Sequence, residues 1–222
     1  TRRGLLAAQQ IYLPCKEAMQ QTLDGDDPRW STLWRNRSIL LLRQGDIDEA
    51  IERAEMACAH ADTRDLDRWS EARLALASAL QARGDLAAAL HALKSSVTRR
   101  LSRGRRDLLL ARLLERMGSI ARARGQAADA DQWTTQALGL LYRHDAPPGR
   151  VAGVLMEQGL NAAHSGHYDR ALGLFAEAQE TWGDGIPRVQ RAHLHNNRAD
   201  ALAKLGRFGD AADAFAQAAG GH

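Results

Sequence analysis

The sequence predicts an all-α fold, an α-solenoid of antiparallel helix pairs, from three observations. Alanine and leucine dominate the 222 residues and only five prolines interrupt them, which favours helix. A glycine recurs at spacings of 39, 41, 41 and 40 residues, and a fixed period of this length is typical of repeat architectures. Small and apolar residues recur at helical offsets around each of these glycines, which are Gly45, Gly84, Gly125, Gly166 and Gly206.

The residues around each glycine predict a helix, a turn and a second helix. A small residue stands seven positions before every glycine, namely Ser38, Ala77, Gly118, Gly159 and Ala199. An alanine stands five positions after it, namely Ala50, Ala89, Ala130, Ala171 and Ala211. The offsets −7 and −4 share one helical face, as do +2, +5, +9 and +12. We therefore expect the glycine to end the first helix in a left-handed conformation, and the small residues to let the two backbones approach closely.

The period divides the chain into a half-repeat and five repeats within one solenoid, residues 1–222. Residues 5–22 are expected to form a second helix without its first helix, and Pro14 is expected to kink it or to end a first segment. The full repeats are expected at 30–61, 68–101, 105–142, 150–182 and 188–219. Solenoid ends need capping repeats, so the half-repeat and the end "AQAAGGH" suggest a chain cut from a longer protein.

This pattern resembles the tetratricopeptide repeat family, in which small and large residues alternate across two antiparallel helices joined by a glycine turn. Trp34, Leu114 and Leu155 match the family's large residue near the start of the first helix, whereas Arg73 and His195 depart from it. The usual period is about 34 residues. The period here is near 40, which resembles the long-period variant of bacterial MalT-like transcription regulators and animal cortical-polarity adaptors. The resemblance covers about residues 30–219 and implies a right-handed, tetratricopeptide-like superhelix.

No motif in the sequence predicts catalysis. A glycine-rich phosphate loop, a zinc-protease helix motif and a nucleophile elbow are all missing, so we expect neither an enzyme nor a cofactor. His164 and His167 are three residues apart, and His193 and His195 are two apart. The second pair points to different sides of one helix, so we expect no metal site.

The stretch "LLLRQGDIDEA", residues 40 to 50, contains three carboxylates that could hold a cation or could stabilise a helix N-terminus. Asp46, Asp48 and Glu49 follow Gly45 directly. The positions equivalent to Asp46 in the other repeats are Asp85, Gln126, His167 and Arg207. Because the carboxylate is not repeated, we interpret this stretch as helix capping that complements the helix dipole.

The candidate binding surface is the inner face that the resemblance assigns to the first helices. Asn36, Arg116 and Asn197 share the position nine residues before the glycine. An asparagine amide can bond both polar groups of a peptide backbone, and an arginine fork binds carboxylates. Ala75 and Glu157 break the family's full two-carboxylate clamp, so a solvated polar face remains the alternative. The predicted site residues are Arg35, Asn36, Arg43, Arg112, Arg116, Arg122, Asn196, Asn197 and Lys204.

A basic window extends from Lys94 to Arg124, with ten basic residues against Asp107 and Glu115, a net charge of +8. It could attract an acidic partner or nucleic acid, or it could be an arginine-rich surface without a ligand. No aromatic residues interleave the arginines, which makes nucleic acid unlikely as a ligand.

The resemblance implies a protein- or peptide-binding scaffold or sensor, the regulatory part of a larger bacterial signalling or transcription-regulatory protein with its effector domain outside this chain. The alternative is a basic-patch binder of nucleic acid or of a phosphorylated ligand. A homodimer through the solenoid ends is a further expectation. No run of about 18 apolar residues predicts a membrane span, and Cys15 and Cys58 form no motif, so we expect a cytoplasmic protein with free thiols.

Overall fold

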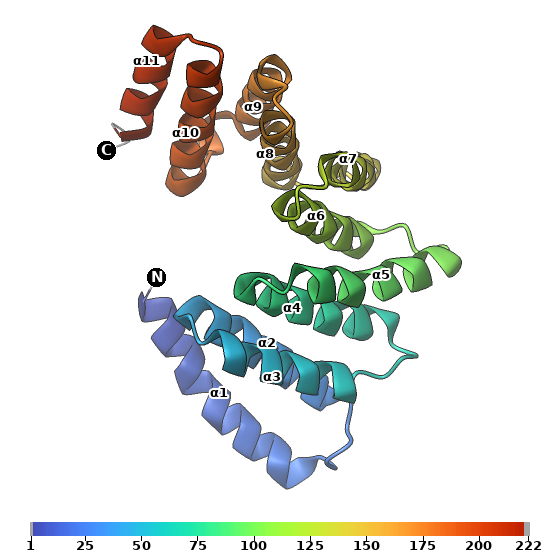
Figure 1. Ribbon diagram of the computed structural model, residues 1–222. Helices are drawn as coiled ribbons and strands as arrows, with labels where there is room; N and C mark the ends of the chain where they lie inside the picture. Colours follow the sequence, from blue (N-terminus) through green and yellow to red (C-terminus); the bar gives the residue numbers. More distant parts are fainter. Residues whose placement is uncertain (1, 220–222) are drawn as a thin grey trace. The chain divides into compact units, whose positions relative to one another are not determined.

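The computed structural model describes residues 2–219, and it is helical throughout that part (Figure 1). The elements are α1 (Arg2–Thr22), α2 (Arg29–Gln44), α3 (Ile47–His60), α4 (Leu66–Arg83), α5 (Leu86–Ser102), α6 (Leu108–Ala123), α7 (Ala127–Arg143), α8 (Pro148–His164), α9 (Tyr168–Trp182), the short 3-10 helix η1 (Gly183–Gly185), α10 (Arg188–Lys204) and α11 (Phe208–Ala219). The chain divides into two compact units, and the boundary in the sequence lies between Arg105 and Arg106. The first unit holds α1 to α5, and the second holds α6 to α11.

Each predicted glycine turn reverses the chain between two packed helices. The five repeat glycines all have positive φ, from 72° at Gly125 to 94° at Gly84. After α2, the amide of Asp46 donates to the carbonyl of Leu41 (3.1 Å) and the amide of Gly45 donates to that of Leu42 (3.3 Å). These bonds satisfy carbonyls that the helix end leaves open. The predicted left-handed glycines are confirmed, and the short turns make the paired helices antiparallel.

Small residues form the contact inside each pair, as the offsets predict. The Ser38 hydroxyl is buried and donates to the carbonyl of Ala50 across the pair (2.7 Å). A Cβ at Gly118 would lie 2.7 Å from Cγ2 of Thr134, so no side chain fits there without movement. The alanine five positions after each glycine is buried in all five repeats. The repeated small residues are therefore the sites of closest approach between the two helices.

Two local predictions need correction. Pro14 does not end a helical segment, because α1 continues through it, and the kink at Pro14 stays a prediction. The Asp46 side chain makes no capping hydrogen bond at α3; Asp65 provides such a cap instead, accepting from the amide of Arg68 at the start of α4 (3.0 Å). The Gly45 turn positions the backbone of Asp46. The start of α3 is therefore fixed by the hydrogen bond of the Asp46 backbone amide and not by its carboxylate.

No helix in the described part of the chain is both long enough and apolar enough to cross a bilayer.

Candidate functional site

The first helices of the second unit, α6, α8 and α10, lie next to one another and carry six of the predicted site residues. Arg112, Arg116 and Arg122 lie on α6, and Asn196, Asn197 and Lys204 lie on α10. Neighbouring first helices meet in pairs, α6 with α8 and α8 with α10. The two contacts have different chemistry.

Ion pairs join α6 to α8. Arg122 pairs with Glu157, and Arg150 donates to Oε1 of Glu115 (2.5 Å). Burial raises the pKa of Glu115 even though Arg150 opposes the shift. Burial also lowers the pKa of Arg116, against the opposing effect of Glu157 and then Glu115. Much of the predicted arginine surface on α6 therefore interacts with carboxylates of its own unit.

A groove of about 320 Å³ separates α8 from α10, and its polar side chains are not used inside the protein. Its polar lining consists of His164, Asn197, Asp200 and Lys204. Within residues 2–219, these four side chains make no hydrogen bond or ion pair. The apolar lining is Leu160, Ala163, Tyr168, Phe175 and Ala201. The groove thus offers an amide, an ammonium, a carboxylate and an imidazole beside an apolar floor.

The first unit holds the other three predicted residues, at a groove of about 360 Å³ between α1 and α2. Asn36 and Arg43 line this groove with Leu33 and Ile39. Arg35 does not line the groove. It pairs with Glu71 of α4 and also donates to Oδ1 of Asn36 (3.1 Å). Asn36 consequently has only part of its amide available to a ligand.

The basic window is divided between the two units. In the first unit, Arg100 is fully buried and donates to Oδ1 of Asp67 (2.8 Å), and Arg105 contacts the same carboxylate. The guanidinium of Arg99 lies 5.0 Å from the centroid of the Trp69 ring, which suits a cation–π contact. These arginines stabilise their own unit, and the net charge of +8 overstates what this segment can offer to an anion.

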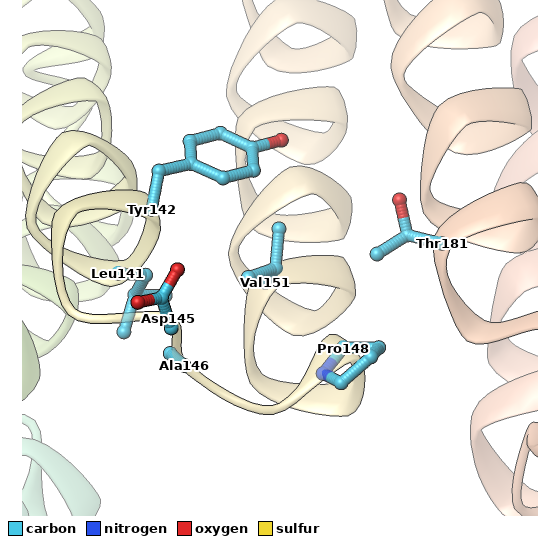
Figure 2. Close-up of a pocket in the computed structure, with 7 residues that line it drawn as sticks. All are labelled: Leu141, Tyr142, Asp145, Ala146, Pro148, Val151 and Thr181. Atoms are coloured by element: carbon cyan, nitrogen blue, oxygen red, sulfur yellow. The ribbon is translucent and has the colours of Figure 1, made fainter.

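Sequence reasoning missed two features. Tyr168 lines the α8–α10 groove, although its position two residues after the glycine indicated only a core role. Another hollow, of about 380 Å³, lies at the N-terminal end of α8. It is lined by the linker between α7 and α8 and by the C-terminal ends of α7 and α9 (Figure 2). No repeated position marks this hollow, because Asp145 and Ala146 belong to the variable linker and the other lining residues come from three different helices.

Three comparisons with known proteins relate this geometry to a family. Residues 156–221 match the tetratricopeptide repeat family model. The structure is similar to BtubC (BKLC) from P. vanneervenii, with a TM-score of 0.78 and 17% identity over 99% of this chain and 90% of that one. It is also similar to a Rap protein complexed with competence and sporulation factor, with a TM-score of 0.75 and 12% identity over 92% of this chain and 57% of that one. A search of curated proteins gives no significant match.

The C-terminal part of the chain is therefore similar to tetratricopeptide repeats, and the described chain has the tetratricopeptide-like fold of helix pairs that the sequence predicts. The match to the long-period, MalT-like variant stays a prediction. A third similarity, to a putative kinesin light chain of Podosopora anserina with nearly identical tetratricopeptide-like repeats, has a TM-score of 0.70 at 17% identity over 86% of this chain and 95% of that one.

Proposed function

We propose that this chain is a protein- or peptide-binding module and that the α8–α10 groove receives an extended segment of its partner. The observation that carries the proposal is the groove's polar lining, whose side chains have no hydrogen-bond or ion-pair partner within residues 2–219. Polar groups on the α6–α8 contact are instead paired with each other. The Rap protein of the same fold, complexed with competence and sporulation factor, supports a role in recognising a factor.

The groove chemistry indicates what such a segment contains. The Asn197 amide can donate to a backbone carbonyl and accept from a backbone N–H, which holds an extended peptide without reading its sequence. Lys204 favours a carboxylate within reach, and Asp200 disfavours a second one nearby. Leu160 and Tyr168, which are both half-buried, provide an apolar surface for one side chain. We infer a segment with one apolar side chain next to one acidic group.

The experiment selects peptides from a random heptapeptide library on the full chain and measures their affinity by fluorescence polarisation. Asn197→Ala should weaken a selected peptide about tenfold, the effect of losing one to two hydrogen bonds. Asn196→Ala is the matched control, since Asn196 is exposed on the same helix and does not line the groove. Equal affinities of the two variants, or no enriched peptide, would contradict the proposal.

At the level of biology, we propose a cytoplasmic, non-catalytic sensor that regulates an effector domain of a larger bacterial signalling or transcription-regulatory protein. Support comes from the match to tetratricopeptide repeats and from Cys15 and Cys58, which are not joined in a disulfide. Fusion of the chain to a reporter effector, with output measured with and without the selected peptide, tests this role. Output that ignores the peptide would leave a passive scaffold as the better description.

Self-association through α11 and binding of nucleic acid or a phosphorylated ligand are secondary proposals. Phe208 and Phe215 are 71% and 44% exposed and stand seven residues apart, so both lie on one helical face. Light scattering should show a dimer that Phe208→Ser disrupts; a monomer at all concentrations refutes it. Arg103 in the first unit, and Arg106 and Arg124 in the second, are among the exposed basic residues of the window that favour an anion. Undetectable affinity for both duplex DNA and a phosphopeptide at low salt would exclude that function.

A further inference from the structure

We propose that the hollow at the end of α7 is a second recognition site, which binds a basic side chain of a partner protein. This site is separate from the α8–α10 groove and does not depend on that groove's function. Its lining residues are Leu141, Tyr142, Asp145, Ala146, Pro148, Val151 and Thr181. Figure 2 shows Tyr142 and Asp145 on one side, Val151 and Pro148 on α8 in the middle, and Thr181 of α9 opposite them.

The backbone of Asp145 is the first sign that its carboxylate has a role. Asp145 has φ of 46° and is the single non-glycine residue with positive φ in the described chain. The equivalent position in the preceding repeat, 41 residues earlier, is Gly104, which has a φ of 69°. Both residues end a helix with the same hydrogen bond, from Gly104 N to Leu101 O (3.0 Å) and from Asp145 N to Tyr142 O (3.3 Å). A side chain in this conformation costs free energy that glycine avoids.

The lining is rich in acceptors and poor in donors. Asp145 as a carboxylate only accepts hydrogen bonds, and the Thr181 hydroxyl already donates its proton to the carbonyl of Glu177 (2.8 Å), so it can only accept from a ligand. The start of α8 supplies few amides, since Pro147 and Pro148 have no N–H and the amide of Arg150 is bonded to Pro147 O (2.8 Å). This helix start therefore lacks the amides of a usual anion site. The complementary ligand is a cation that carries several donors.

The neighbouring cations leave the Asp145 carboxylate available. Arg150 is paired with Glu115, and the His144 ring nitrogen Nε2 contacts the carbonyl of Arg106 (2.5 Å). Arg143 precedes them on the exposed end of α7. The Asp145 carboxylate itself has no hydrogen bond or ion pair within residues 2–219. The Asp145 carboxylate is therefore available to form an ion pair with a cation of a partner.

The apolar part of the lining specifies the shape of that cation. Tyr142 is 54% exposed, and its ring can face a cation at the same time as Asp145 pairs with it. Pro148, which is exposed, and the half-buried Ala146 can contact the methylene stem of the side chain. A planar guanidinium is weakly hydrated and stacks on aromatic rings, so arginine is the preferred side chain.

The test titrates the full chain, labelled with nitrogen-15, with two capped pentapeptides, acetyl-Gly-Gly-Arg-Gly-Gly-amide and the same peptide with neutral citrulline. An exposed ion pair and one cation–π contact are weak, so we expect dissociation constants of about a millimolar. The arginine peptide should shift the amide resonances of residues 141–146, 149–151 and 181, and the citrulline peptide should bind at least about tenfold more weakly. Equal shifts with both peptides, or none with either, would overturn the proposal.

Two variants separate recognition from folding. Asp145→Asn removes the charge and keeps a residue that tolerates positive φ, and it should abolish the difference between the two peptides. Asp145→Gly matches Gly104, so it should raise the midpoint of thermal unfolding and also lose arginine binding. Arginine binding retained by either variant would show that the carboxylate is not the ligand's partner.

Discussion

At the scale of single residues, His195 is a polar side chain at a core position of the repeat. The same offset, eleven residues before the glycine, holds the buried Leu114 and Leu155 in the two preceding repeats. His195 is 8% exposed, and its Nδ1 is buried without a hydrogen-bond partner. Burial, assisted by Arg198 and then Arg191, lowers the pKa of His195 below its ordinary value of 6.5.

We predict that His195→Leu raises the free energy of unfolding by about 1–2 kcal/mol at pH 7, because it replaces an unsatisfied polar atom with apolar surface. The lowered pKa adds a pH dependence. Below pH 6.5 the unfolded chain binds more protons than the folded chain, because the pKa of His195 is lower in the folded state. The wild-type protein therefore keeps its full stability above pH 6.5 and loses part of it as the pH falls from 6.5 towards the pKa of folded His195. The advantage of the leucine variant should therefore grow on acidification. Urea titrations at neutral and mildly acidic pH measure it.

His193→Leu is the control for this prediction. His193 lies two residues earlier on the same helix and is exposed, so its replacement should change the stability by less than about 0.5 kcal/mol at either pH. If the two leucine variants show the same pH dependence, burial of His195 is not its cause.

At the scale of the element, two of the three glycines of α8 have opposite surroundings. A Cβ at Gly159 would lie 2.7 Å from Cδ1 of Phe175 on α9, whereas a Cβ at Gly153 would meet nothing within 4 Å. Phe175 is fully buried and cannot swing into solvent without opening the pair. We predict that Gly159→Ala destabilises the protein by about 1–3 kcal/mol through overpacking.

Gly153→Ala should instead stabilise the protein by about 0.5–1 kcal/mol, because alanine is the better helix former and has room there. Chemical denaturation of both variants gives the comparison. If both variants changed the stability in the same direction, the close approach of α8 and α9 would not be what determines the effect of a substitution in α8.

The same element shows what the sequence can and cannot predict. Gly159 stands at the small position of its repeat, so the pattern alone located the contact with α9. The ion pairs between repeats follow a weaker signal, because Arg122 and Glu157 stand 35 residues apart, near the repeat period. Which cation meets which carboxylate depends on the rotation between successive helix pairs, and local offsets do not encode that rotation. The arginines of α6 were therefore predicted as open binding residues, although Arg122 is paired.

Asp145 lies outside the repeated positions around the turn glycines. Its left-handed backbone follows from where α7 ends, and the sequence "RHDAPPG" indicates a linker without indicating a hollow. Asn197 and Lys204, in contrast, follow from the periodic register of α10, so their side of that helix could be predicted. Their groove could not, because most of its apolar lining comes from residues of α8 and α9, among them Leu160 and Tyr168.

At the scale of the whole molecule, the repeats determine how damage spreads. Within each unit of the described chain, the helices contact helices of their own repeat and of the repeats beside it. In such an array, stability is close to a sum of repeat and nearest-neighbour terms, without a single shared core. We predict that Gly159→Ala lowers the hydrogen-exchange protection of α8 and α9 most, that of α7 and α10 less, and leaves α2 and α3 near their wild-type protection.

Hydrogen exchange followed by mass spectrometry resolves these segments, and Gly153→Ala reports the response to a substitution without a clash. Equal loss of protection from α2 to α10 would show that the chain unfolds as one cooperative unit. A graded loss has a functional consequence, because it allows the α8–α10 groove to open or tighten without unfolding the first unit. Ligand bound in that groove should then restore protection in α8 to α10 before it affects any other helix, and the same measurement with a selected peptide tests that order.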